Sequence, residues 1–240
     1  METLQDKNVV VIGATGGIGR ALCKLLVGSR AQVYLTSTDA AAASSLATEL
    51  KLDASRAHHL DVTDHDAVLA KAAHIEQSLG DQGVDILINA SGIGIIKPLE
   101  QLAIEEFRQT LDVNLTGTFS LLQGFVPAMK ARKRGLIINL PGVLGKTPMA
   151  GAAAYAASKY GLNGMLKSVR EELRRTQVRI TNLYLGGTDT PFWDEIDLRV
   201  QRDKFVTAEE AARSIWFLCQ QPSSGVVSEM VLQPFNHQAI

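Results

Sequence analysis

The sequence predicts an α/β fold in which one doubly wound domain, residues 1–240, holds a parallel sheet of about seven strands with helices on both faces. Two observations predict this class. Short apolar runs alternate with longer segments of helical character, as in parallel strands joined by right-handed crossover helices. A glycine-rich stretch from Gly13 to Gly19 follows the first apolar run and opens the next helix. A chain of 240 residues is long enough for one large core of this kind.

The predicted strands are rich in Val, Ile and Leu, because the strands of a parallel sheet are buried on both faces. They are expected at residues 8–13, 31–36, 57–60, 84–89, 135–140, 179–185 and 226–232. The crossover helices are expected at residues 17–28, 40–50, 64–79, 104–132, 153–176 and 208–221. Thr207, three residues before Glu210, predicts a capping box for the last helix. Residues 190–206 combine charged and turn-forming side chains and are expected to be irregular.

Composition and charge exclude several classes of function. The net charge is −1 with acidic and basic residues interspersed, which predicts no nucleic-acid partner. No apolar run is long enough to span a membrane and no leader is recognisable, so we expect no membrane association and a cytoplasmic location. Cys23 and Cys219 are expected to be buried thiols of a reducing compartment. No metal site is predicted, because no ligand spacing is shared by His58, His59, His65, His74 and His237.

The glycine-rich turn has the chemistry of a pyrophosphate site. Glycines let backbone N–H groups approach phosphate oxygens, and the N-terminus of the following helix adds a favourable dipole. The glycines are spaced G-x-x-x-G-x-G rather than G-x-G-x-x-G. The predicted cofactor contacts in this turn are Gly13, Thr15, Gly16, Gly17, Ile18 and Gly19. Taken alone, such a cluster also suits an ordinary tight turn.

Tyr155 and Lys159 are four residues apart at the start of a predicted helix, so their side chains share one face. Hydride transfer to a carbonyl carbon leaves an alkoxide that needs a proton, and a tyrosine hydroxyl is able to supply it. A free tyrosine has a pKa of about 10, and a nearby lysine ammonium is expected to lower that pKa toward neutral pH. The pair therefore indicates an acid–base centre, although such a spacing also arises by chance.

The order and spacing of these motifs resemble the short-chain dehydrogenase/reductase family, which has a Rossmann-type fold and uses NAD or NADP. The resemblance extends from Asn8 to about Pro234. It implies that Tyr155 is the acid–base group, that Lys159 positions the cofactor ribose, and that Asn114 holds a water molecule in a proton relay. The residues alone leave open a solvent-facing Asn114.

The resemblance also implies cofactor contacts at the ends of the predicted strands. Asp61 and Val62 correspond to a segment that contacts adenine, and residues 89–92 stand where the family shows Asn-Asn-Ala-Gly. Thr188 corresponds to a residue whose backbone contacts the nicotinamide amide, and Thr190 corresponds to one whose hydroxyl contacts the cofactor. Beyond the glycine turn, the implied cofactor-binding residues are Ser37, Thr38, Asp61, Val62, Asn89, Ala90, Ser91, Gly92, Tyr155, Lys159, Thr188 and Thr190.

The catalytic serine of the family is missing. It stands 13 residues before the tyrosine, where this chain has Gly142 preceded by Pro141. Its hydroxyl donates a hydrogen bond to the substrate carbonyl, and losing such a donor lowers a rate by on the order of 10²–10³. Thr147 is an alternative source of a hydroxyl. A second departure is Leu185, which replaces a proline and is expected to loosen the loop after the sixth strand.

NADP(H) is favoured over NAD(H) as the cofactor. Members of the family that prefer NAD carry an acidic residue at the end of the second strand, where this chain has Ser37 and Thr38, and Asp39 comes too late. No carboxylate at that place repels a 2′-phosphate. No arginine is placed there to pair with the phosphate either, and Arg20 is expected on a helix surface.

The leading hypothesis is an NAD(P)-dependent oxidoreductase that interconverts a carbonyl and an alcohol by hydride transfer, with an activity weakened by Gly142. The alternative is a catalytically impaired dinucleotide-binding protein that acts as a redox sensor or a scaffold. The resemblance further implies a homodimer or a homotetramer.

The expected partner is a small-molecule carbonyl or alcohol substrate. Its specificity is expected to depend on residues 93–99, 144–152 and 192–206. Phe192 and Trp193 either line an apolar site or pack this last segment against the body of the protein.

Overall fold

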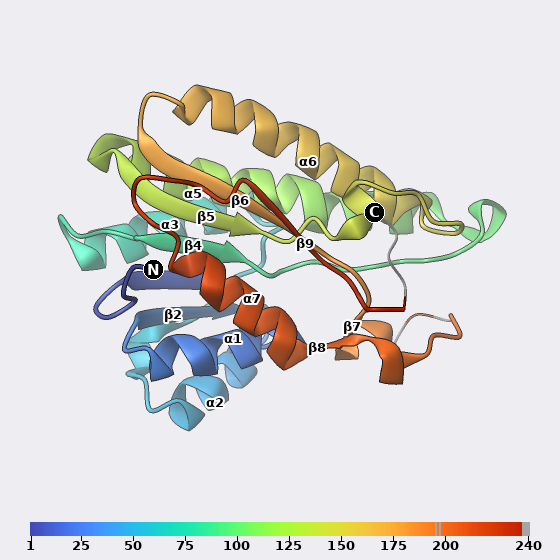
Figure 1. Ribbon diagram of the computed structural model, residues 1–240, viewed down its shortest axis with the longest axis horizontal. Helices are drawn as coiled ribbons and strands as arrows, with labels where there is room; N and C mark the ends of the chain where they lie inside the picture. Colours follow the sequence, from blue (N-terminus) through green and yellow to red (C-terminus); the bar gives the residue numbers. More distant parts are fainter. Residues whose placement is uncertain (195, 197, 237–240) are drawn as a thin grey trace.

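In the computed structural model, which describes residues 1–194, 196 and 198–236, the main sheet has the strand order β3-β2-β1-β4-β5-β6-β9 (Figure 1). Its seven strands are all parallel. They are β1 (Asn8–Ile12), β2 (Gln32–Ser37), β3 (Ala57–His59), β4 (Ile86–Asn89), β5 (Arg134–Asn139), β6 (Gln177–Leu185) and β9 (Glu229–Leu232). A second sheet pairs β7 (Thr188–Asp189) with β8 (Val206–Thr207). The predicted doubly wound α/β class is confirmed.

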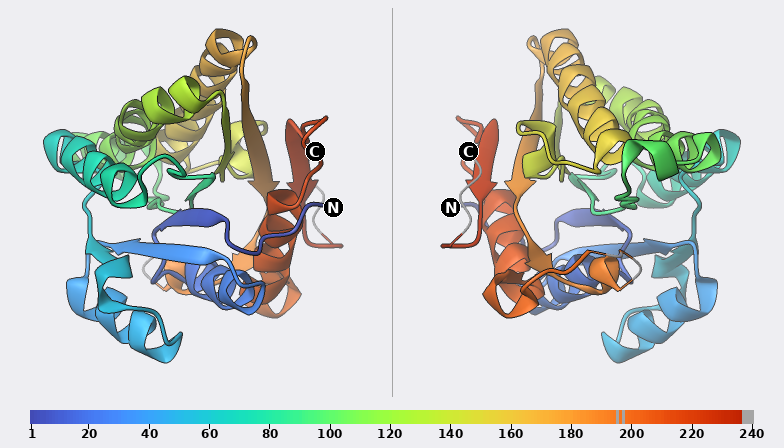
Figure 2. Two further views of the ribbon diagram at one scale, coloured as in Figure 1. Left: turned by 90° about the vertical axis from the view of Figure 1, so that its left-hand side faces the viewer. Right: turned by 90° about the vertical axis from the view of Figure 1, so that its right-hand side faces the viewer.

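Helices cover both faces of the main sheet. Figure 2 shows α1, α2 and α7 on one side of the sheet and α3, α5 and α6 on the other. The helices are α1 (Gly17–Gly28), α2 (Ala40–Glu49), α3 (His65–Leu79), α4 (Ile104–Leu111), α5 (Gly117–Arg132), α6 (Ala153–Leu173) and α7 (Ala208–Cys219). On their respective faces α1 packs beside α7, and α3 packs beside α5.

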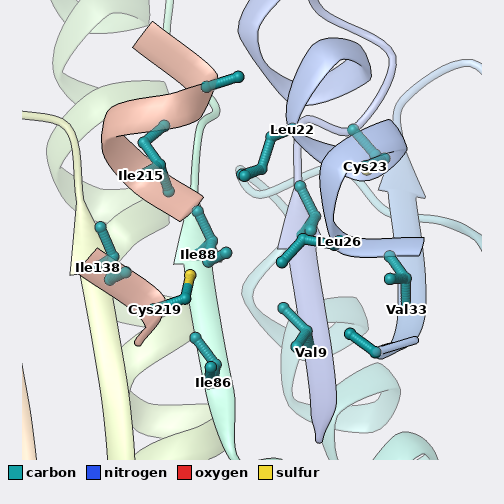
Figure 3. Close-up of a cluster of buried hydrophobic side chains, with 14 of the residues drawn as sticks. Val9, Leu22, Cys23, Leu26, Val33, Ile86, Ile88, Ile138, Ile215 and Cys219 are labelled. Carbon is teal, nitrogen blue, oxygen red and sulfur yellow. The ribbon is translucent and has the colours of Figure 1, made fainter. Parts of the chain in front are cut away.

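Each face of the sheet has its own hydrophobic cluster, which explains why the strands are apolar throughout. In β1, Val9 points into the cluster under α1 and α7, whereas its neighbour Val10 points into the cluster under α3, α5 and α6. Figure 3 shows the first cluster, in which Cys23 and Cys219 lie among Leu, Ile and Val side chains. Both cysteines are buried, as predicted.

The predicted helix over residues 104–132 is interrupted, so the expectation of one continuous helix was wrong. Helix α4 ends at Leu111, Asp112–Thr116 forms a π-helical turn, and α5 begins at Gly117. Within this stretch Thr118 Oγ1 donates to the Asn114 carbonyl oxygen over 2.8 Å. A π-helical turn is one residue wider than an α-helical turn, so it changes the direction in which Asn114 projects. The spacing of apolar residues in the sequence does not reveal such a turn.

Smaller features follow the sequence closely. The capping box is confirmed, because Thr207 Oγ1 accepts from the Glu210 N–H and the Glu210 carboxylate accepts from the Thr207 N–H. The last strand is shorter than predicted and begins at Glu229. Between β7 and β8 the described residues form only two short 3₁₀ turns, Pro191–Trp193 and Arg202–Lys204.

Two further observations bear on the expectations above. Among the described residues, no helix combines the length and the apolar character needed to cross a membrane. Of the histidines considered as metal ligands, His237 lies outside the described residues.

Candidate active site

A cavity of about 790 Å³ opens at the carboxyl ends of β1, β4, β5 and β6. In the strand order β1 and β4 are neighbours, and it is here that the chain reverses the direction in which it adds strands, the usual place for ligands in open α/β sheets. The cavity lining includes Thr15, Gly16, Gly17, Ile18, Gly19, Ala90, Ser91, Gly92, Tyr155, Lys159, Thr188 and Thr190. The predicted residues that do not line it are Gly13, Ser37, Thr38, Asp61, Val62, Asn89 and Asn114.

The glycine turn packs so closely against its neighbours that it has no room for side chains. Gly13 has a φ of +74°, and a Cβ there would lie 3.0 Å from the Ala90 carbonyl oxygen. A Cβ on Gly19 would lie 2.9 Å from Ala14 Cα, and one on Gly17 would lie 2.9 Å from the Thr190 side chain. Gly13 and Gly19 are therefore needed for the tight packing of the turn, whereas Gly17 makes room for Thr190.

The first turn of α1 is suited to an anion. Gly16 is its N-cap and provides no side-chain cap, and the turn carries no acidic residue. The N–H groups at this helix end are therefore available to an external acceptor, and the helix dipole favours a negative charge there. The chemistry of these residues fits the pyrophosphate of a dinucleotide.

The end of β2 presents hydroxyl groups rather than a carboxylate. Ser37 Oγ lies 2.7 Å from Thr15 Oγ1, so the two hydroxyls form a pair beside the glycine turn. The Asp39 carboxylate is engaged elsewhere, because it accepts from the Ala42 N–H over 2.9 Å and caps α2. Arg20 is exposed and bonds to Glu49, in agreement with its expected place on a helix surface.

The predicted contacts after β3 and β4 help to shape the cavity wall. Asn89 Nδ2 donates to Thr118 Oγ1 over 2.9 Å, and Asn89 Oδ1 accepts from the Ser91 hydroxyl over 2.6 Å. Asn89 thus ties the end of β4 to α5 and orients the next turn. The Asp61 carboxylate accepts from the Thr63 N–H and hydroxyl, and buried Val62 packs against α5.

Asn114 is buried at 2% exposure, so the solvent-facing alternative is wrong. Its Nδ2 donates to the Ile93 carbonyl oxygen and to Ser158 Oγ, over 2.9 and 3.0 Å. Its Oδ1 accepts from the Ile93 N–H over 2.9 Å. Asn114 therefore joins the loop after β4 to helix α6 and uses both of its amide hydrogens in doing so, which leaves one Oδ1 lone pair for a water molecule.

Tyr155 and Lys159 lie together on the face of α6 that borders the cavity. Lys159 Nζ is 5.3 Å from the centre of the Tyr155 ring and donates to the Leu140 carbonyl oxygen over 3.1 Å. A Cβ on Gly92 would lie 3.1 Å from Asn114 Oδ1 and 3.5 Å from Lys159 Nζ. The three residues that the sequence predicted as catalytic are thus close together, with Tyr155 and Lys159 lining the cavity and Asn114 buried behind its lining.

Burial changes the pKa of both of the side chains predicted to be catalytic. It raises the pKa of Tyr155 to about 12 and lowers the pKa of Lys159 to about 8. The prediction that the ammonium lowers the pKa of Tyr155 was wrong, because the cost of burying a phenolate outweighs the attraction of a Lys159 ammonium that lies 5.3 Å from the ring centre. At neutral pH the tyrosine is a neutral phenol and therefore a proton donor.

Gly142 occupies a conformation that the sequence did not reveal. Its φ is +70° and its ψ is 165°, a combination that is essentially restricted to glycine. A Cβ at this position would lie 3.8 Å from Tyr155 Oη and 3.5 Å from the Leu185 carbonyl oxygen. Space for a hydroxyl beside Tyr155 is therefore present, whereas the hydroxyl is not. Thr147 lines the same cavity.

The segment after β6 forms one wall of the cavity. Phe192 and Trp193 both line it, and Trp193 Nε1 also donates to the Thr188 carbonyl oxygen over 2.9 Å. Both alternatives for these residues, lining and packing, are therefore realised. The ion pairs of Arg202 were not predicted, because no sequence pattern links charged residues that are far apart in an irregular segment. It bonds to Asp189 and to Asp194, each over 2.6 Å.

Comparisons with known proteins agree with this geometry. The model of a family described as short chain dehydrogenase matches residues 7–201. A 3-oxoacyl-(acyl-carrier-protein) reductase from Aquifex aeolicus is 30% identical, and the match covers 95% of this chain and 96% of the relative. The chain belongs to the short-chain dehydrogenase/reductase family of oxidoreductases.

Two solved structures cover nearly the whole chain. A metagenomic short-chain oxidoreductase in complex with NADP is 32% identical with a TM-score of 0.80, and an alcohol dehydrogenase from the archaeon Thermococcus sibiricus, complexed with 5-hydroxy-NADP, is 25% identical with a TM-score of 0.86. Each similarity covers 97% of this chain and 99% of the other.

Proposed function

We propose that the protein is an NADP(H)-dependent oxidoreductase that interconverts a carbonyl and an alcohol. The observation that carries the proposal is the convergence of Tyr155 and Lys159 with the glycine turn on one cavity. NADP bound to one similar structure and 5-hydroxy-NADP bound to another support a dinucleotide as the ligand. The choice of NADP(H) over NAD(H) is supported by Ser37, since no carboxylate stands at the end of β2 to repel a 2′-phosphate.

The residues present fit such a cofactor. The glycine turn and the N-terminus of α1 would hold the pyrophosphate, and Thr188 and Thr190 stand on the wall where the nicotinamide part is expected. Bound NADPH supplies the hydride. Tyr155, protonated at neutral pH, donates the proton to the oxygen of the reduced carbonyl. Lys159, with a pKa of about 8, carries a positive charge at neutral pH and stabilises the phenolate that is left.

Asn114 acts as a positioning residue in this proposal. Its hydrogen bonds fix Ile93 and Ser158, and Ser158 is the direct neighbour of Lys159 on α6. The water-holding role implied by the family would use the remaining acceptor capacity of Oδ1. Asp61, Val62 and the turn at residues 89–92 are proposed to bind the adenine and ribose parts of the cofactor.

The test is the initial rate of NADPH and NADH consumption with a panel of aldehydes and ketones. Tyr155→Phe should lose nearly all of the turnover, on the order of 10²-fold or more, because the proton donor is gone. Tyr160→Phe is the matched control, since Tyr160 lies on the same helix but is 45% exposed, and it should keep the wild-type rate. Equal rates for wild type and Tyr155→Phe would contradict the proposed chemistry.

Gly142 favours a second candidate function, a dinucleotide-binding protein with weak or no turnover that acts as a redox sensor or a scaffold. No side chain at this position is able to donate to a carbonyl. NADPH binding of ordinary affinity, combined with no turnover by any variant, would support this alternative. A homodimer or homotetramer, a single catalytic domain and a cytoplasmic location remain predictions, and sedimentation analysis of the purified chain tests the first of them.

A further inference from the structure

Phe192 reaches across the cavity from the segment after β6 to the segment after β4. A Cβ on Gly94 would lie 2.8 Å from the ring atom Cε2 of Phe192, so the ring rests where a side chain at position 94 would stand. The Phe192 ring also lies beside the Tyr155 ring, and the two ring centres are 5.8 Å apart. Phe192 therefore contacts both the segment after β4, at Gly94, and the Tyr155 ring.

The position of this ring is fixed by a row of aromatic side chains. Phe192 packs edge-on against Trp193 at 5.4 Å, and Trp193 packs against Phe205 at 5.2 Å. Trp193 is itself anchored to the backbone at Thr188, next to the cofactor wall. A Cβ on Gly187 would lie 2.7 Å from the Phe205 ring, so this glycine gives the last member of the row its place.

Most of the other side chains in this part of the cavity are apolar, although Thr147 and Gln201 also line it. Its described lining includes Ile96, Val143, Leu144, Met149, Leu198 and Val200. Lys159 and Lys204 are the charged side chains among the described lining residues, and Lys204 is exposed. With no acidic group in that lining, the cavity offers no carboxylate to a cationic substrate, and its apolar walls offer few partners to a substrate rich in hydroxyl groups.

We propose that Phe192 is a specificity-determining residue, and that the substrates are apolar carbonyl compounds that carry no positive charge and have a flat or slender group beside the carbonyl. This inference rests on the proposed carbonyl–alcohol chemistry and adds the class of substrate to it. Because Phe192 touches both Gly94 and the neighbourhood of Tyr155, a bulky carbonyl substituent meets the ring before the carbonyl carbon reaches the catalytic corner.

The experiment uses acetophenone and tert-butyl phenyl ketone, which differ only in the bulk of one carbonyl substituent. In Phe192→Ala, kcat/KM for the bulky ketone relative to acetophenone should rise about tenfold or more. Phe217→Ala is the matched control, because Phe217 is a 47% exposed aromatic residue on α7, and it should leave the ratio unchanged. An unchanged ratio in Phe192→Ala overturns the proposal.

Gly94→Ala provides an independent test of the same contact. Gly94 does not adopt a positive φ, so alanine is compatible with its backbone, but its methyl group must displace the Phe192 ring. We expect this substitution to change the ratio by about threefold or more in the wild type and hardly at all in Phe192→Ala. If Gly94→Ala changes the ratio equally in the wild type and in Phe192→Ala, the Phe192 ring does not lie against Gly94 in solution.

Binding measurements separate this proposal from the proposed function. The dissociation constants of both ketones, measured by titration calorimetry in the presence of NADP⁺, should show the same change of ratio in Phe192→Ala. If the wild type turns over neither ketone, the proposed function is contradicted while these constants still decide the role of Phe192. Failure to bind either ketone, or a higher kcat/KM for glyceraldehyde than for acetophenone, overturns the apolar substrate class.

Discussion

The Cβ position of Gly142 lies 3.8 Å from the hydroxyl oxygen of Tyr155, so the residue that lacks a side chain faces the Tyr155 hydroxyl directly. Its φ of +70° is disfavoured for any other residue, and a side chain there costs about 1–3 kcal/mol of stability. Gly142→Ser and Gly142→Ala should therefore both lower the free energy of unfolding by this amount. Denaturant titration of the three proteins measures it.

The activities of the same two variants should differ. A serine hydroxyl beside Tyr155 is able to donate to a substrate carbonyl, whereas an alanine methyl group is not. We expect kcat/KM of Gly142→Ser to exceed that of Gly142→Ala by on the order of tenfold or more, because the strain is shared and only the hydroxyl differs. Equal kcat/KM values would show that the hydroxyl does not reach the carbonyl from this backbone.

We expect the buried charge of Lys159 to lower the free energy of unfolding of the protein. Burial lowers its pKa from 10.5 to about 8, so the folded state carries a disfavoured ammonium below pH 8. Lys159→Met should therefore raise the free energy of unfolding by ~2 kcal/mol at pH 7, after allowance for the lost hydrogen bond to Leu140. The unfolded chain binds more protons between pH 8 and 10.5, so the gain should shrink as the pH rises through that window.

Denaturant titrations of Lys159→Met at pH 7 and pH 10 check this, and turnover should be lost at both. Lys167→Met is the matched control, because Lys167 lies on the same helix with its side chain 56% exposed. A stability gain in the control as large as that in Lys159→Met would assign the effect to helix propensity and not to the buried charge.

His58 should make the fold sensitive to acid. Burial, with smaller contributions from the nearby Lys71 and His74 charges, lowers its pKa from 6.5 to about 4. The unfolded chain therefore binds more protons between pH 4 and 6.5, and about 3 kcal/mol of stability should be lost as the pH falls through this range. His58→Phe retains a ring that stacks on Tyr34 and should flatten that slope. Denaturant titrations between pH 4 and 7 measure it, and identical slopes would contradict the prediction.

The sequence predicted those parts of the site that depend on order and spacing. The glycine turn follows β1 and the Tyr155–Lys159 pair shares a face of α6, because strand ends and helical periodicity follow directly from local pattern. The π-helical turn at Asn114 and the positive φ of Gly142 depend on packing between distant segments. The same is true of the contact between Phe192 and Gly94, which brings together two irregular loops.

The pKa of Tyr155 shows why the electrostatics of the site were also beyond the sequence. A lysine four residues away predicts a lowered pKa, and the structure has the pair in place. The sequence does not state how deeply a helix face is buried, and it is this burial that raises the pKa of Tyr155 and lowers that of Lys159.

The end of β2 should decide which dinucleotide is used. Ser37 forms a hydroxyl pair with Thr15, and Asp39 is held away by its bond to α2. Ser37→Asp should place a carboxylate beside the 2′-position of the ribose, where it repels a phosphate and accepts from a hydroxyl. We expect KM for NADPH relative to NADH to rise about tenfold or more. Ser37→Asn is the matched control, because it has the same shape without the charge. A similar rise of this KM ratio in Ser37→Asp and Ser37→Asn would assign the effect to steric crowding. An unchanged KM ratio in Ser37→Asp would mean that the 2′-phosphate does not bind beside residue 37.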